Sequence, residues 1–175
     1  ALSAAIAATS GIELANLLMN RAVARMQQHE LTGCIDDLDR AVDIYDEARA
    51  DEPLAEARHN RGYAALLAGD LVTALALMTR SRPVLAATSD LAAAIGDQDR
   101  AEVLREAGQV AEAERLLADV AVRFGAQRMP QARAEAEFQL ARSLLRHDAR
   151  GAERTASVAA RRFDALDNRA WAARA

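Results

Sequence analysis

Apolar residues recur along this chain with the period of an α-helix, in consecutive stretches separated by short polar turns. In the first stretch Leu14, Leu18 and Ala22 share one face, at the three- and four-residue spacing of an amphipathic helix. No stretch alternates between apolar and polar residues as a half-buried strand does. The pattern predicts helices over about residues 12–28, 32–50, 54–68, 70–82, 91–107, 110–124, 131–146, 150–166 and 168–175.

Glycine and proline mark the ends of several of these helices. Gly69 and Gly108 follow helical stretches, where a residue with positive φ stops a helix at least cost. We expect the segment 29–33 to form a turn that includes Gly33. Pro83 removes a backbone donor, so it should end or kink its helix at Ser81–Arg82, with residues 84–87 resuming a helix.

The predicted helices form consecutive pairs, and the first helix of each pair carries a small residue at a fixed interval along the chain. Ala22, Gly62, Ala101 and Ala141 follow one another at intervals of about 40 residues, and a period of this length is typical of a solenoid of helix pairs. In such a solenoid each pair packs only against its neighbours. The period predicts one all-α repeat domain over residues 1–175, with pairs at about 12–51, 53–88, 90–125 and 130–166 and a terminal helix at 168–175.

Each second helix carries a stripe of residues at spacings of four and three, which places them on one helical face. Aromatic residues make up only 3% of the chain, so close approach of the helices must build the core. The stripes are Cys34-Leu38-Ala41, Ala74-Met78-Ser81, Ala113-Leu117-Val120 and Ala152-Ala156-Ala159.

These two patterns resemble the tetratricopeptide repeat (TPR). The best match runs from Arg61-Gly62 through Gly69 to the stripe that ends at Ser81. The chain departs from the family in its longer repeat period, and in the arginines 21, 61 and 100 at the usual leucine position. The resemblance implies a right-handed α-solenoid of four TPR-like helix pairs plus a terminal helix.

The segment from Arg162 to Trp171, together with the Asn-Arg-small pattern of the first helices, is similar to repeat arrays that precede bacterial CHAT domains, which are caspase-like peptidases. That resemblance implies that the catalytic His and Cys lie beyond Ala175, and that this segment recognises a partner or regulates the peptidase. The chain lacks an initial Met and ends inside an apparent helix. We therefore interpret it as a piece of a longer protein.

In related repeat arrays, a polar column beside the small residue faces the inner groove. Here that column is Asn20, Asn60, Asp99 and Gln139. An asparagine amide can bridge the N–H and C=O of an extended peptide, so the resemblance implies a peptide-binding groove. The alternative is that these are ordinary solvated polar residues. The other residues expected to line the groove are Val23, His59, Tyr63, Glu102 and Arg142.

Arginine at positions 21 and 61 has a structural and a ligand-binding interpretation. A half-buried guanidinium must be paired, and the second helix of the first repeat is acidic. We favour the structural interpretation, in which Arg61 contacts one of the carboxylates of that helix, namely Asp36, Asp39 or Asp43.

Charge and cysteine content narrow the possible partners. The formal net charge is −4 and all 22 basic residues are arginine, which gives no electrostatic reason to bind nucleic acid or an anionic membrane. No apolar run approaches the roughly 20 residues that span a bilayer. The single cysteine, Cys34, excludes an internal disulfide and is typical of a cytoplasmic protein.

Motifs for catalysis, metal binding and cofactor binding do not occur in the sequence. Cys34 falls on a buried stripe where the other repeats have alanine, so we expect a core thiol rather than a nucleophile. His29, His59 and His147 have no partner at metal-ligand spacing, and no phosphate loop or nucleophile motif is present. The sequence therefore predicts a protein that is not an enzyme and has no cofactor or metal.

The leading interpretation is a scaffold whose concave groove binds a protein or peptide segment. A homodimerisation or spacer module, in which a second copy or the chain's own Trp171 helix fills the groove, remains an alternative. A further alternative is an enzyme with a convergent polar site in the groove.

Overall fold

The computed structural model describes residues 11–175, and residues 1–10 of the expected domain lie outside the described part. Every regular element in that part is a helix. The described part divides into two compact units, with the boundary between residues 89 and 90. Each unit is considered by itself.

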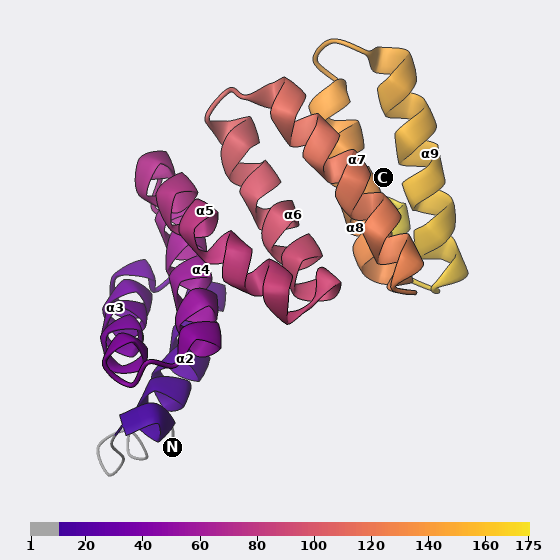
Figure 1. Ribbon diagram of the computed structural model, residues 1–175. Coiled ribbons are helices and arrows are strands. Elements are labelled where there is room, and N and C mark those ends of the chain that lie inside the picture. Colours follow the sequence, from indigo (N-terminus) through magenta and orange to yellow (C-terminus); the bar gives the residue numbers. More distant parts are fainter. Residues whose placement is uncertain (1–10) are drawn as a thin grey trace. The chain divides into compact units, whose positions relative to one another are not determined.

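The first unit contains four helices of 17 or 18 residues, each packed against the next along the chain (Figure 1). Its core joins both pairs, since Leu14 and Leu18 cluster with Tyr45 and with Leu54 of the following pair. The elements are α2 (Gly11–Gln27), α3 (Leu31–Glu47), α4 (Asp51–Leu67) and α5 (Leu71–Thr88).

The second unit repeats this order and adds a short fifth helix. Phe124 packs with Ala94 and Ala136, and Phe163 packs with Ala134. The elements are α6 (Asp90–Glu106), α7 (Val110–Ala126), α8 (Pro130–Leu144), α9 (Ala149–Ala165) and α10 (Arg169–Ala172). The terminal helix is therefore shorter than the expected span of 168–175.

The small residues of the first helices are all buried, as their spacing predicts. Ala22 and Ala101 are fully buried and Ala141 is 3% exposed. At Gly62, an added Cβ would lie only 3.1 Å from the carbonyl oxygen of Ala74 on α5. Backbones thus approach closely at this column, which explains why no large side chain occupies it.

Five of the turns between helices, and the turn before α10, share one backbone geometry. The position of glycine in the sequence identifies only two of these turns. His29, Arg49, Arg128 and Asp167 adopt positive φ values of 54–61°, as Gly69 and Gly108 do at 82° and 79°. After each, a backbone N–H donates to the carbonyl five residues earlier, for example Glu30 to Arg25 at 2.9 Å, which is the Schellman arrangement. The expectation that Gly33 belongs to the turn is wrong, because α3 already begins at Leu31.

Pro83 does not end its helix, contrary to one expectation from the sequence. Helix α5 continues through Pro83 to Thr88. Both Pro83 and Thr79, whose carbonyl loses its donor, are exposed, so water can satisfy the freed oxygen.

We predict that Gly62→Leu lowers the free energy of unfolding by about 2–3 kcal/mol, because the side chain must displace α5. Gly62→Ala should change it by no more than about 1 kcal/mol, since alanine fills the same column elsewhere and favours helix. Urea unfolding followed by far-UV circular dichroism measures both. Equal stability of the leucine variant and the parent would contradict the close approach.

Candidate functional site

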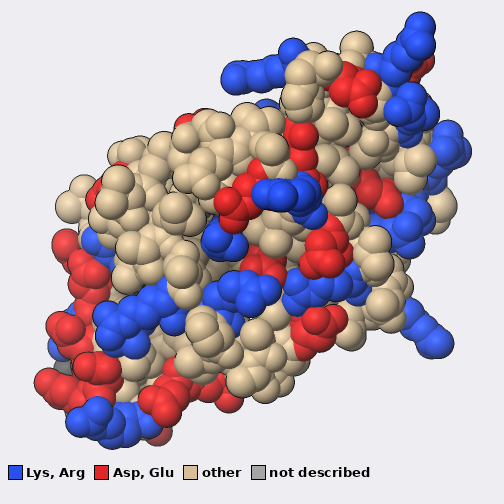
Figure 2. All heavy atoms as spheres, turned by 45° about the horizontal axis from the view of Figure 1, so that its top comes forward, with Lys and Arg blue, Asp and Glu red and all other residues tan. Residues whose placement is uncertain are grey.

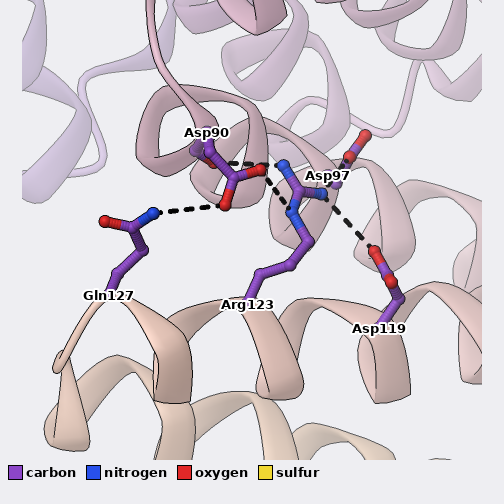
Figure 3. Close-up of polar contacts among 5 residues, drawn as sticks. All are labelled: Asp90, Asp97, Asp119, Arg123 and Gln127. Atoms are coloured by element: carbon purple, nitrogen blue, oxygen red, sulfur yellow. Dashed lines mark hydrogen bonds and ion pairs between the residues drawn. The ribbon is translucent and has the colours of Figure 1, made fainter.

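Buried ion pairs hold the helices that carry the candidate site. In the first pair of the second unit, Arg123 on α7 inserts between two carboxylates of α6, as Figure 3 shows. Its Nη1 lies 2.9 Å from Asp97, which is fully buried, and its Nε lies 3.0 Å from Asp90. Burial lowers the pKa of Arg123, but hydrogen bonding to Asp97 and the charge of Asp90 raise it by more. The guanidinium therefore stays charged and fixes α7 to α6.

The next pair repeats this interaction at equivalent positions. Arg162 lies one repeat period after Arg123, and Glu137 lies one period after Asp97. The Nε of Arg162 lies 2.7 Å from Glu137, which is 8% exposed. One buried arginine–carboxylate pair thus joins the two helices of each pair in the second unit.

The arginines at the usual leucine position all pair with carboxylates. Arg61 Nε lies 2.7 Å from Asp39 of α3, so the predicted contact is confirmed. Arg21 Nε donates to Asp37 at 2.7 Å, and this hydrogen bond raises the pKa of Arg21. Arg100 lies 3.2 Å from Glu112. These guanidiniums therefore have a structural role.

In the first unit, the predicted groove residues lie on the neighbouring helices α2 and α4. Ala22 of α2 and Ala64 of α4 belong to one core cluster, together with Cys34 and Leu38 of α3. Asn20 is exposed and Asn60 is half-buried. His59 differs from the others because only 7% of its surface is exposed, which leaves little of its ring for a ligand.

Two side chains with apolar surface follow these amides along their helices. Val23 is 42% exposed and Tyr63 is half-buried. Each follows its asparagine by three residues, so it lies about one helical turn further along the same side of the helix.

In the second unit, the predicted residues lie on α6 and α8. Asp99, Glu102 and Gln139 are half-buried and Arg142 is exposed. Glu102 lies 3.9 Å from Arg105, one turn along α6. This part of the predicted face is therefore charged, whereas the first unit presents amides.

Gln139 and Arg142 open onto a hollow of about 390 Å³. Two arginines border it over aromatic rings, with Arg142 at 5.9 Å from the centre of Phe138 and Arg174 at 5.6 Å from that of Trp171. Such cation–π contacts hold a guanidinium in place while its donors stay available. The hollow is lined by Glu135, Phe138, Gln139, Arg142, Trp171 and Arg174.

An aromatic cluster forms one wall of this hollow, and sequence reasoning missed it. Trp171 stacks on Phe163 at a centroid distance of 5.4 Å and meets Phe138 edge-on at 5.9 Å. Three of the six aromatic residues of the chain thus gather here. The scarcity of aromatic residues was the sequence feature that could have drawn attention to these three. Their separation along the chain did not show that their rings are in contact.

The remaining features of the candidate site are the charge of the surface, the single cysteine and the possible metal ligands. Figure 2 shows arginine and acidic side chains interspersed on the face drawn. Cys34 is fully buried, and burial raises the pKa of its thiol, so the expected core thiol is confirmed. Within residues 11–175, no group of His, Cys, Asp and Glu could hold a metal ion, and no helix has the length and apolar character to cross a bilayer.

Comparison with known proteins finds solved structures with a similar fold. No family model matches the chain, and no curated protein sequence matches it. It is similar to a solved structure of the nearly identical TPR-like repeats of a Podosopora anserina protein described as a putative kinesin light chain, with a TM-score of 0.70. That match has 18% identity and covers 90% of this chain and 89% of the other.

A single-residue variant of the same repeats gives a TM-score of 0.69 at 18% identity, covering 90% of this chain and 88% of that one. The chain therefore has a TPR-like fold. The all-α, paired-helix expectation is confirmed for the described residues.

We predict that Asp97→Ala lowers the free energy of unfolding of the second unit by about 3 kcal/mol, because it leaves Arg123 without its buried partner. The control is Asp119→Ala, which removes a partner of Arg123 that is 3.5 Å away and 61% exposed, and should cost less than about 0.5 kcal/mol. Fluorescence of Trp171 during urea unfolding reports on this unit. Equal losses in the two variants would contradict the assignment.

We also predict that Trp171→Ala lowers the unfolding free energy of the second unit by about 2 kcal/mol, because it removes both ring contacts. Trp171→Phe should retain most of that stability by keeping the stack on Phe163. Thermal unfolding measured by circular dichroism distinguishes them. An unchanged Tm for Trp171→Ala would show that the cluster contributes nothing.

Proposed function

We propose that this chain is a non-catalytic protein-interaction scaffold, and that the groove face of its first helices binds an extended protein or peptide segment. The observation that carries the proposal is the pair of amides Asn20 and Asn60, accessible on neighbouring helices and one repeat period apart. The TPR-like fold supports it, because such arrays present one side of every first helix on a shared surface.

The chemistry of this face suits the main chain of a ligand. An asparagine amide supplies one acceptor and two donors, so each asparagine can pair with the N–H and C=O of one peptide unit. Val23 and Tyr63 then provide apolar contact beside the amides. Recognition of this kind gives affinity through the ligand backbone and selectivity through the neighbouring pockets.

In the second unit, the corresponding residues offer a different chemistry. Gln139 supplies an amide at the corresponding position of α8, while Arg142 offers guanidinium donors at the rim of the hollow of about 390 Å³. Asp99 and Glu102 add negative charge on α6. A ligand segment that reaches this unit therefore meets charged groups rather than amides alone.

The proposal also includes the cellular setting of the protein. Resemblance to the arrays that precede CHAT domains supports a segment of a longer bacterial protein that recruits a target to a peptidase or regulates it. A single buried cysteine fits the reducing cytoplasm.

The test is selection of peptides from a random display library on the full chain, followed by affinity measurement with one selected peptide. We predict that Asn20→Ala and Asn60→Ala each weaken binding about fivefold or more, because each removes hydrogen bonds to the ligand. N-methylation of the peptide at the contacted positions should also weaken binding.

The matched control is Gln28→Ala, which removes an exposed amide in the turn after α2 and should leave the affinity unchanged. If no peptide is selected, or if both asparagine variants bind like the parent, the proposed groove is wrong. A chain that associates with itself through these residues would instead support the homodimerisation alternative.

A further inference from the structure

An open groove lies at the end of the last helix pair, between α8 and α9. Its volume is about 310 Å³ and most of its exposed lining is apolar. Leu145, the residue that follows α8, lies at its edge and is 66% exposed. The groove is lined chiefly by Phe138, Ala141, Leu145, Ala152, Glu153 and Ala156.

The same site occurs in the first pair, where it is filled. Each of those six residues has an equivalent in the first pair, three repeat periods earlier in the sequence. The difference in residue number is the same for all residues of one helix. In the first pair, Ala64 of the following helix α4 packs into the site and is fully buried. The equivalent residues are Met19, Ala22, Met26, Cys34, Ile35 and Leu38.

A second filled copy belongs to the pair of α6 and α7, where α8 is the following helix. Ser143 of α8 occupies the position of Ala64, since each lies equally far from the first residue of its helix. Ser143 is 3% exposed and its hydroxyl donates to Glu114 of α7 at 2.7 Å. Glu153 in the open groove is the equivalent of Glu114, one repeat period further on.

Helix α10 begins in the register of a further first helix. Its first residue lies one repeat period after the first residue of α8. Ala172 and Ala175 lie three and six residues after its start and pack on the core cluster that contains Phe163. Leu54 and Ala57 hold the same positions in α4 and pack on Tyr45, the equivalent of Phe163.

We propose that the groove between α8 and α9 is a repeat-docking site, and that its occupant is a first helix that continues α10 beyond residue 175, with a small residue at position 182. The inference rests on the proposal that the chain is a segment of a longer protein, but not on peptide binding to the amide face. The two filled copies select the occupant, because the residue of the following helix at this position is small and buried in both, Ala64 in one and Ser143 in the other.

The experiment extends the full chain with a copy of its own segment 137–146, so that α10 continues as α8 does and serine falls at position 182. We predict a rise in Tm of about 3 °C or more, from the added buried surface. The control carries the same extension with aspartate at position 182, which would bring an unpaired negative charge beside Glu153 and should give no rise. Equal shifts for the two extensions would overturn the proposal.

A crosslink gives a second readout that does not depend on stability. With Ala152→Cys and a cysteine at position 182 of the extension, oxidation should form a disulfide, because Ala152 corresponds to Cys34, which packs beside Ala64 in the first pair. Arg154→Cys, on the exposed side of α9, is the control and should not crosslink. Crosslinking of the control alone, or of neither variant, would contradict docking in this groove.

Neither readout involves the amide face. Loss of peptide binding in the asparagine variants and failure of the extension to dock are therefore separate results.

Discussion

Close approach of two helix backbones at a small residue is the constraint on which each pair depends. At Gly62 the clearance to α5 is too small for any side chain beyond a methyl group, and Ala22, Ala101 and Ala141 are buried at the same position. Because so little volume separates the helices, the chain can build its core from alanine with only six aromatic residues. The large side chains are placed instead where one pair meets the next, as Tyr45, Phe124 and Phe163 are.

Ion pairs compensate for the limited apolar volume. Asp97 and Glu137 are buried carboxylates, and each is neutralised by an arginine of the partner helix. A buried charge without its partner is costly, so these pairs fix the register of the two helices more than they add net stability. In the first pair, the equivalent positions hold Leu18 and Ile44, so the same contact can be made by apolar packing.

The repeat also determines where surfaces remain available. A side that packs against the following pair is covered in the interior of an array, whereas the groove beside Ala152 and Ala156 is open. The polar column beside the small residue is exposed or half-buried in every first helix. The two surfaces differ in chemistry, since the groove is mostly apolar and the column is polar.

The sequence by itself determined the helical class, the period, the buried small column and the contact between Arg61 and an acidic residue of α3, because each depends on local periodicity or on a charge that must be neutralised. Tertiary structure alone decided which carboxylate each arginine meets, the cluster of Phe138, Phe163 and Trp171, and the continuation of α5 through Pro83. These outcomes depend on which residues distant in sequence become neighbours and on which side of a helix faces water. A helical period places residues on a face, but only packing decides what that face contacts.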